Sequence, residues 1–155
     1  MLEQLNPVNL IPKVICGFPG VGKTTLFNEL KDRDIKIVDS DSSKFDKANF
    51  PANYIEHIKE KLAEGYYILC STHSVVRQAL ANADIVYLLV IPASADQKPE
   101  YMARYQERGS PQPFLDLMEA KWDEFMFDVW NDENSIIFPL WPGQYLDTLV
   151  DKITT

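Results

Sequence analysis

The stretch Gly17-Phe18-Pro19-Gly20-Val21-Gly22-Lys23-Thr24 decides the fold of this 155-residue chain. An apolar, β-branched run at residues 13–16 precedes it, and apolar residues recur at helical spacing over residues 24–31. A short apolar run that ends at a glycine is typical of a strand, whereas apolar residues three and four apart are typical of a helix. The stretch is therefore predicted to be a tight loop that joins a strand to a helix.

The loop matches the pattern G-x-x-x-x-G-K-[ST] at every fixed position. Glycines let the backbone curl so that successive N–H groups form a concave anion site, and the N-terminus of the following helix adds positive charge. We expect Lys23 to reach the β- and γ-phosphates of a nucleoside triphosphate and Thr24 to offer its hydroxyl to Mg²⁺. The simpler alternative is a glycine-rich turn that only reverses the chain. The expected nucleotide-binding residues are Gly17, Gly20, Val21, Gly22, Lys23, Thr24 and Thr25.

Apolar runs and helical patterns alternate along the rest of the chain. Further strands are predicted at residues 35–38, 66–70, 85–91 and 135–138. Helices are predicted around residues 54–62, 75–81, 98–107, 114–130 and 144–153. Strands joined by helical crossovers favour a parallel sheet in an α/β fold. The whole chain, residues 1–155, is expected to form this single domain, with an irregular segment over residues 1–11.

The charge and composition argue against several kinds of partner. The chain has 15 basic and 23 acidic side chains and a net charge of −8. Because long nucleic acids are held by lysine and arginine on their phosphates, such a partner is not expected, whereas a small anion needs only a few local donors. No run reaches the ~20 apolar residues of a membrane span, and the N-terminus lacks a signal-peptide pattern. We expect a cytoplasmic protein without membrane contact.

Two acidic residues follow the second predicted strand, in Asp39-Ser40-Asp41-Ser42-Ser43. Ligands of open α/β sheets bind beyond the carboxyl ends of strands, so this segment is expected beside the glycine-rich loop. One carboxylate would hold a magnesium-bound water, and the other would hydrogen-bond or deprotonate an acceptor hydroxyl. The structural alternative is an Asx turn with a helix N-cap, because Asp and Ser favour both.

Arg104 and Arg108 lie four residues apart and hence on one face of the helix predicted around residues 98–107. The chain has only four arginines, and a transferring phosphoryl group needs mobile cationic donors. These two residues are therefore predicted to belong to a lid that closes over the γ-phosphoryl group. The alternative is a solvated face in which they pair with Glu100 or Glu107.

The loop, the D-x-D sequence after the second strand and the arginine pair after the fourth together resemble the P-loop small-molecule kinase group, which includes nucleoside, nucleoside-monophosphate and shikimate kinases. The chain is also similar to compact phage-type nucleotide kinases, which join a Ser-x-His sequence after strand three to an arginine-rich lid. This resemblance implies a three-layer P-loop NTPase fold whose five parallel strands follow the order 2-3-1-4-5. It further implies that Asp39 is the magnesium-side acid and Asp41 the acceptor-side acid, with Arg104 and Arg108 as lid arginines. Nucleoside kinases often carry an Asp-Arg pair after strand three, where this chain reads Cys70-Ser71-Thr72-His73.

The acceptor side has several candidates, each with a structural alternative. Phe45, Phe50 and Tyr54 could sandwich an aromatic base, although aromatics at this spacing also suit a core. A polar group among Ser71, Thr72 and His73 could support the acceptor or the magnesium water shell. A plain helix N-cap, with Ser74 as the capping residue, is the structural alternative. Arg77 could reach an acceptor phosphate or form a surface ion pair. The candidate acceptor-binding residues are thus Asp41, Ser43, Phe45, Tyr54, His73 and Arg77.

Two further side-chain patterns concern helices. His57, in the helix after Pro51, is expected to be solvated. Met126, Phe127 and Trp130 widen the apolar stripe of the long helix at residues 114–130, which is expected to be buried but would also suit a homodimer contact.

The expected protein is an ATP- and Mg²⁺-dependent phosphotransferase that acts on a nucleoside or nucleotide. Its expected catalytic residues are Lys23, Asp41, Arg104 and Arg108, and its expected metal ligands are Thr24 and Asp39. One alternative is polynucleotide 5′-kinase, which the acidic charge opposes. Another is a nucleotide-binding sensor or ATPase that acts through a protein partner, which an exposed apolar surface on the long helix would favour.

Overall fold

Residues 11–154 are described by a computed structural model, and within them five strands form one parallel sheet. The strands are β1 (Val14–Gly17), β2 (Ile37–Asp39), β3 (Tyr67–Cys70), β4 (Tyr87–Pro92) and β5 (Ser135–Leu140). Their order in the sheet is β2-β3-β1-β4-β5, which confirms the predicted parallel sheet and its strand order. Except for Ile11, the predicted irregular segment over residues 1–11 lies outside the described residues.

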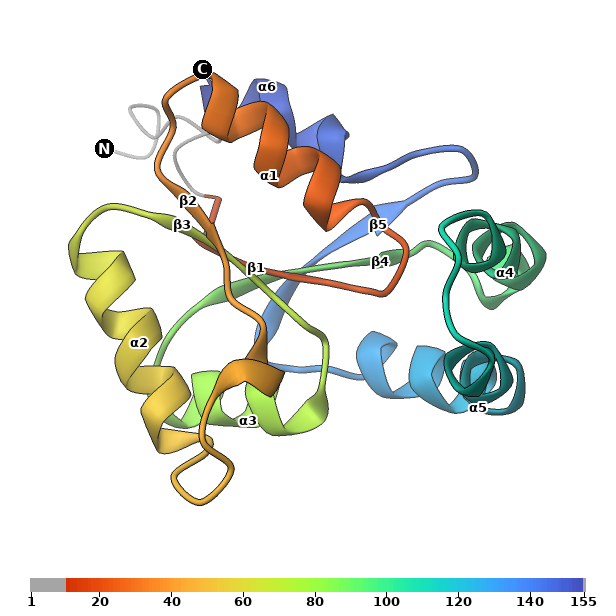
Figure 1. Cartoon of the computed structure of the whole chain (residues 1–155), viewed down its shortest axis with the longest axis horizontal. Coiled ribbons are helices and arrows are strands. Elements are labelled where there is room, and N and C mark those ends of the chain that lie inside the picture. The colour runs from red at the N-terminus through yellow and green to blue at the C-terminus, as the bar shows by residue number, and fades with distance from the viewer. Residues whose placement is uncertain (1–10, 155) are drawn as a thin grey trace.

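Helices cover both faces of this sheet. Those within residues 11–154 are α1 (Lys23–Asp32), α2 (Ala52–Ala63), α3 (Ser74–Asn82), α4 (Lys98–Glu107), α5 (Gln112–Trp130) and α6 (Val150–Thr154), with 3₁₀ turns η3 (Ser42–Lys44), η4 (Ala95–Gln97) and η5 (Leu146–Leu149). Figure 1 shows α1 and α6 on one side of the strands and α2, α3 and α5 on the other. None of the helices in the described part of the chain is both long and apolar enough to cross a bilayer.

The central strands β1 and β4 are buried at every position, as the continuous apolar run at residues 85–91 predicts. Cys16 of β1 is level with Cys70 of β3, and Gly17 is level with Val90 of β4. The segments that come after these three strands therefore emerge at one edge of the sheet, where open α/β sheets bind their ligands.

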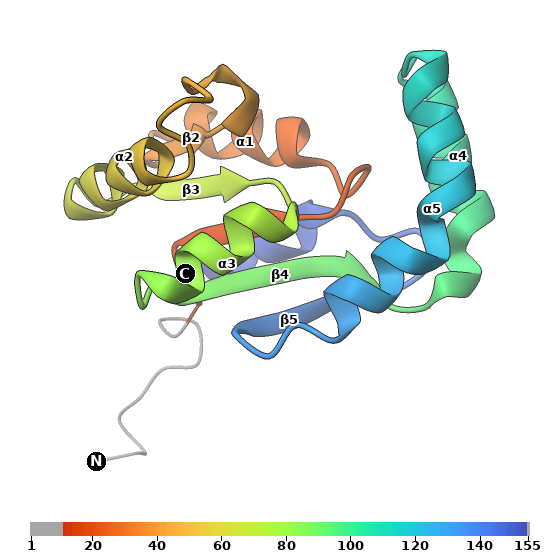
Figure 2. The ribbon, with the colours of Figure 1, turned by 90° about the horizontal axis from the view of Figure 1, so that it is seen from below.

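The pair α4 and α5 stands beyond this edge. Figure 2 shows α4 and the first half of α5 rising at the end of the sheet to which the arrowheads of β3 and β4 point. Phe18, the residue after β1, meets the rings of Trp122 in α5 and Tyr101 in α4 edge-on, with centroid separations of 5.4 and 6.2 Å. All three side chains are buried, so an aromatic core fastens these helices to the segment after β1.

The chain after β5 differs from the prediction of a helix over residues 144–153. It forms the 3₁₀ turn η5 and then the short helix α6. Tyr145 has an extended backbone, and the N–H of Leu146 donates to the carbonyl of Val21 at 2.7 Å. Because this bond ties the chain to the segment after β1, the helix begins later than its apolar pattern indicates.

Candidate functional site

The glycine loop, which we define as residues 17–24, leaves the end of β1 and enters α1 at Lys23. Gly20 and Gly22 have φ angles of +89° and +96°, a left-handed conformation that L side chains rarely adopt. A Cβ on Gly20 would also lie 2.8 Å from a ring carbon of Tyr105, so no larger residue fits there. The predicted tight loop between a strand and a helix is confirmed, and its two central glycines are required by the backbone.

A cavity of about 650 Å³ lies over the glycine loop. The loop and the start of α1 line it with Pro19, Gly20, Gly22, Lys23, Thr24 and Thr25. Three other segments complete the lining with Ser71 and His73 after β3, Arg104, Glu107 and Arg108 at the end of α4, and Tyr145 after β5. The structure thus brings most of the predicted nucleotide-binding residues together with His73, Arg104 and Arg108. Gly17 and Val21 are buried and do not line the cavity.

Lys23 is the cavity's lysine and the first residue of α1. Burial lowers the pKa of its ammonium from the ordinary 10.5, and the charge of Asp39 opposes this shift. Within residues 11–154, no carboxylate forms an ion pair with this ammonium. A partly desolvated cation without a counterion is costly, so the environment of Lys23 favours an anionic ligand in the cavity.

The prediction that Arg104 is a mobile lid donor is wrong. The residue is 8% exposed, and its guanidinium donates to the carbonyl oxygens of Gly20 and Gln144 at 2.9 Å each. It also pairs with Glu100 at 2.5 Å, one of the two partners in the structural alternative, but the pair is not on the solvated face that this alternative assumed. Because these partners come from three segments, Arg104 is immobilised and holds the glycine loop against α4.

Two tyrosines strengthen this attachment. The hydroxyl of Tyr105 donates to the carbonyl of Pro19 at 2.8 Å. The ring of Tyr145 lies 3.7 Å from the Arg104 guanidinium and packs over Gly22. The carbonyl groups of Pro19 and Gly20 therefore accept hydrogen bonds from α4. The chain after β5 covers the glycine loop at Gly22.

Arg108 keeps the freedom that a lid residue needs. It is exposed, its Nε donates to the Ser110 hydroxyl at 2.9 Å, and its guanidinium lies over the rings of Tyr105 and Phe114. Its charge also contributes to lowering the pKa of Lys23, after the larger effect of burial. Exposed contacts of this kind contribute little stability, so Arg108 can exchange them for a ligand in the cavity.

Asp39 and Asp41 do not line the cavity over the glycine loop. Oδ1 of Asp41 accepts hydrogen bonds from the Ser43 backbone N–H at 2.9 Å and from its hydroxyl at 2.7 Å. These bonds lower the pKa of Asp41 and make it the N-cap of η3, so the Asx-turn alternative describes the arrangement of Asp41 and Ser43. Asp39 is exposed at the end of β2, close enough for its charge to affect Lys23.

The aromatic side chains near β2 pack on one another. Tyr54 is fully buried and donates to the Ser40 carbonyl at 2.7 Å, and Phe45 meets its ring edge-on at 4.9 Å. The predicted sandwich around an aromatic base is therefore wrong for Tyr54, whose ring belongs to the core.

His57 is half-buried, so the prediction of a solvated side chain is correct only in part. Its Nε2 lies 2.8 Å from the Ser40 hydroxyl, its ring contacts Phe45, and partial burial lowers its pKa. The sequence could have indicated this burial, because His57 lies three residues after Tyr54 and hence on the same face of the helix.

Ser71 and His73 lie after β3, at the cavity. The prediction that Ser74 caps α3 is wrong, because α3 begins at Ser74 and the capping position belongs to His73, whose side chain makes no cap bond. His73 is exposed, and the hydroxyl of Ser71 is buried without a hydrogen-bond partner within residues 11–154. A buried hydroxyl at a cavity is free to bond to a ligand or a bound water.

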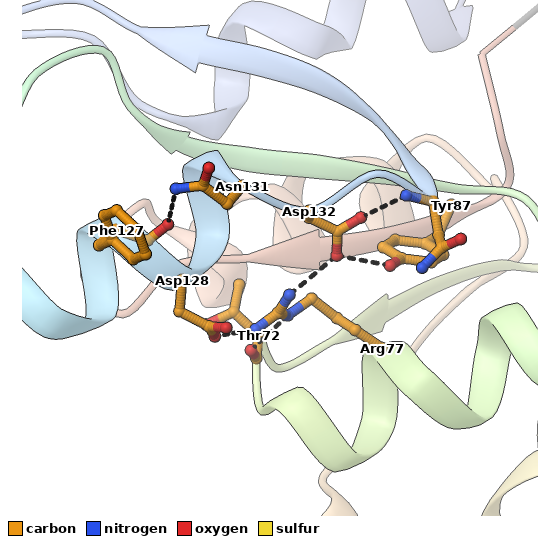
Figure 3. Close-up of polar contacts among 8 residues, drawn as sticks. Thr72, Arg77, Tyr87, Phe127, Asp128, Asn131 and Asp132 are labelled. Atoms are coloured by element: carbon orange, nitrogen blue, oxygen red, sulfur yellow. Dashed lines mark hydrogen bonds and ion pairs between the residues drawn. The ribbon is translucent and has the colours of Figure 1, made fainter.

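Arg77 lies away from the cavity. Figure 3 shows its guanidinium directed toward Asp128 and Asp132 at the end of α5. It donates to the carbonyl of Thr72 and to Asp132, both at 2.8 Å, and forms an ion pair with Asp128. Arg77 does not line the cavity and its charge is paired, so the predicted contact with an acceptor phosphate is wrong. The alternative of an ion pair describes it better, with one partner, Asp128, half-exposed and the other, Asp132, buried.

Within residues 11–154, no group of three or more His, Cys, Asp and Glu side chains is arranged to hold a metal ion. Mg²⁺ does not need such a group, since one or two protein oxygens suffice when phosphates and waters complete its shell. Thr24 lines the cavity, and Asp39 ends the strand next to β3. Of the two expected metal ligands, Thr24 therefore lies at the cavity and Asp39 lies outside its lining.

No protein-family model matches the chain, and a search of curated proteins finds no match.

Proposed function

We propose that the glycine loop binds the triphosphate of ATP and that the protein transfers the γ-phosphoryl group to a small acceptor. The observation that carries this proposal is the Lys23 ammonium, which lines the cavity without a carboxylate partner among residues 11–154. Two further features support a phosphate ligand. Gly20 and Gly22 have a left-handed backbone, and the N-terminus of α1 lies next to them.

Each residue of the cavity has a role in this proposal. Loop amides and Lys23 would hold the phosphates, and the Thr24 hydroxyl with a water on Asp39 would hold Mg²⁺, which when bound neutralises phosphate charge. Arg108 would turn from Ser110 to the γ-phosphoryl group, while Arg104 acts through the loop that it positions. Such a site works by positioning and charge stabilisation.

On the acceptor side, we propose a small hydroxyl compound of the nucleoside or nucleotide class. Both bonds from Ser43 end on Oδ1 of Asp41, so Oδ2 is the oxygen available to an acceptor hydroxyl. Ser71 and His73 line the cavity and offer further polar contacts. Phe45 already packs on Tyr54 and His57, so only its outer face could meet a base.

A second candidate is a nucleotide-dependent sensor or ATPase that acts through a protein partner. One observation favours it: Phe127, Leu117 and Trp130 of α5 are 72%, 46% and 38% exposed. Side chains of this size gathered on one exposed helix often mark an interaction site. Polynucleotide 5′-kinase is disfavoured by the net charge of −8.

The deciding experiment measures ATP consumption with Mg²⁺, alone and with nucleosides, nucleoside monophosphates and small hydroxylated metabolites. The kinase proposal expects one class of acceptor to raise ADP formation above background hydrolysis and to become phosphorylated. Hydrolysis that no acceptor stimulates would favour the sensor or ATPase instead. If the protein binds neither ATP nor inorganic tripolyphosphate, both the kinase and the sensor or ATPase proposals are wrong.

The attachment of the glycine loop to α4 predicts a graded loss of phosphate affinity. Tyr105→Phe removes one hydrogen bond to Pro19 and is expected to weaken tripolyphosphate binding about fivefold. Arg104→Lys removes the bridge between Gly20 and Gln144 and is expected to weaken it about tenfold or more. Calorimetric titration measures both, with Tyr66→Phe at the other end of β3 as the matched control. Unchanged affinity in Arg104→Lys would mean that the loop keeps its shape without α4.

A further inference from the structure

A second, larger hollow lies between α3 and α5, on the face of the sheet opposite α1. We call it the α5 groove, and its volume is about 770 Å³. Figure 3 shows its floor, where Arg77 of α3 meets Asp128 and Asp132 from the end of α5. The groove shares no lining residue with the cavity over the glycine loop, so a role for it goes beyond the proposed nucleotide chemistry and does not depend on that chemistry.

The polar groups on the floor already satisfy one another. Asp132 accepts from Arg77 at 2.8 Å, from the Tyr87 hydroxyl at 2.7 Å and from the Asn134 backbone N–H at 2.8 Å. Arg77 also donates to the Thr72 carbonyl. A floor with paired charges has no reactive group to offer a substrate, so the groove is suited to docking rather than to catalysis.

The rim of the groove is apolar on the α5 side. Phe127 is 72% exposed and Leu117 is 46% exposed, and both line the groove. Phe127 also lines a second hollow of about 410 Å³, together with Met126 and Trp130. A large apolar side chain that stands between two hollows is the geometry of a contact ridge, onto which a partner can fit from both sides.

The charge around this ridge identifies the chemistry of the partner. Four carboxylates, those of Glu124, Asp128, Asp132 and Glu133, line the groove against two cations, those of Arg77 and Lys121. Lys121 is paired with Glu124 at 3.1 Å on the surface, and Asp123 adds a further carboxylate in the second hollow. The groove therefore carries an excess of negative charge next to exposed apolar surface.

This charge excludes three occupants. A second copy would bring the same carboxylates against each other in a symmetric contact. A nucleic acid or an anionic membrane surface would likewise be repelled. A basic polypeptide segment has the complementary charge.

We propose that the α5 groove binds an amphipathic, basic segment of a partner protein. Apolar side chains of that segment cover Phe127 and Leu117. Its lysines or arginines pair with Glu133 and with Glu124, whose exposed pair with Lys121 contributes little stability and can be exchanged. A helical partner segment contacts such a surface through side chains three, four or seven residues apart. Along α5, Glu124 follows Leu117 by seven residues and Phe127 follows Glu124 by three.

The test uses the full chain and a fluorescein-labelled 14-residue helical peptide with leucines on one face and lysines on the other, monitored by fluorescence anisotropy. We expect saturable binding that weakens about tenfold in Phe127→Ser and about fivefold in Glu133→Lys. Phe127 is mostly exposed, so its replacement should leave the fold intact, which thermal unfolding checks. Matched controls are Val86→Ser, at a 59% exposed valine outside the groove, and Glu56→Lys, on the exposed side of α2.

The outcomes separate the proposal from its rivals. Equal losses in the groove variants and the controls would show that the peptide binds only through net charge, and would overturn the proposal. A control peptide with glutamates in place of the lysines should bind more weakly, and equal binding of the two peptides would also overturn the proposal. Sedimentation that shows a dimer of the free chain, dissociated by Phe127→Ser, would assign the groove to a second copy instead. If adding the lysine peptide changes NMR amide chemical shifts only in α3 and α5, the proposal that the α5 groove binds a basic segment is supported.

Discussion

Replacing Lys23 with alanine is expected to lower the affinity for inorganic tripolyphosphate by about a hundredfold or more. The substitution removes a cation that lines the cavity without a carboxylate partner among residues 11–154, and each charge-assisted hydrogen bond to phosphate contributes about 1.5–3 kcal/mol. Titration calorimetry with tripolyphosphate and with ATP and Mg²⁺ measures the loss. Lys31→Ala, at an exposed lysine in the last turn of the same helix, is the matched control and should bind normally.

The pH dependence of binding offers a second measurement on Lys23. Burial lowers the pKa of this ammonium from 10.5, and only the charged form binds phosphate well. Affinity for tripolyphosphate should therefore begin to fall at a lower pH than an ordinary lysine would cause. In Lys23→Arg the guanidinium stays charged, so its affinity should be flat over the same range. If Lys23→Ala binds tripolyphosphate as tightly as the parent protein, the glycine loop is not the phosphate site.

Replacing Arg77 with alanine is expected to cost about 3–5 kcal/mol of the free energy of unfolding, because it leaves a buried carboxylate without its cation. The side chains of Arg77 and Asp132 are 7% and 3% exposed, and Asp132 links the end of α5 to Tyr87 of β4. Urea unfolding measures the loss. Arg33→Ala, which breaks an exposed pair with Glu29 one helical turn away, should cost below about 0.5 kcal/mol. A loss as small as that of Arg33→Ala would contradict the role given to this pair.

The contribution of this pair to stability depends on pH with a defined sign. Burial opposes the ionisation of Asp132, but hydrogen bonds from Tyr87 and Arg77 outweigh it and hold the pKa of Asp132 below 3.8. A carboxyl whose folded pKa is depressed stabilises the fold above its unfolded pKa and loses that contribution as pH falls through the folded value. The difference between Arg77→Ala and the parent should therefore be largest near neutral pH and shrink below about pH 4.

Most of the sheet could be predicted from local patterns. The continuous apolar run before Pro92 indicated a central strand, and β4 is buried at all its positions. Only glycine tolerates the left-handed backbone at residues 20 and 22, so the pattern there marked a true loop. The end of the chain could not be predicted in this way, because a single bond from Leu146 to Val21, between segments far apart in sequence, delays its helix.

The candidate site was predictable in its location but not in its contacts. Strand order places the ends of β1 and β3 together, which brings Lys23 and His73 to one cavity. Arg104 in the last turn of α4 and Arg108 just after it look equivalent in sequence. In the structure, Arg104 is immobilised by Gly20 and Gln144, while Arg108 is exposed. Only the folded chain distinguishes them.

By itself, the sequence determined the parallel sheet and the loop at residues 17–24, because both depend on apolar periodicity and on backbone angles that glycine alone adopts readily. The tertiary structure alone decided where the arginines point. Arg104 turns to carbonyls of two distant loops, and Arg77 turns to the buried Asp132, because a buried guanidinium has to meet acceptors wherever packing places them. That choice makes Arg104 the support of the glycine loop. It leaves Lys23 and Arg108 as the cations of the cavity that no carboxylate within residues 11–154 pairs.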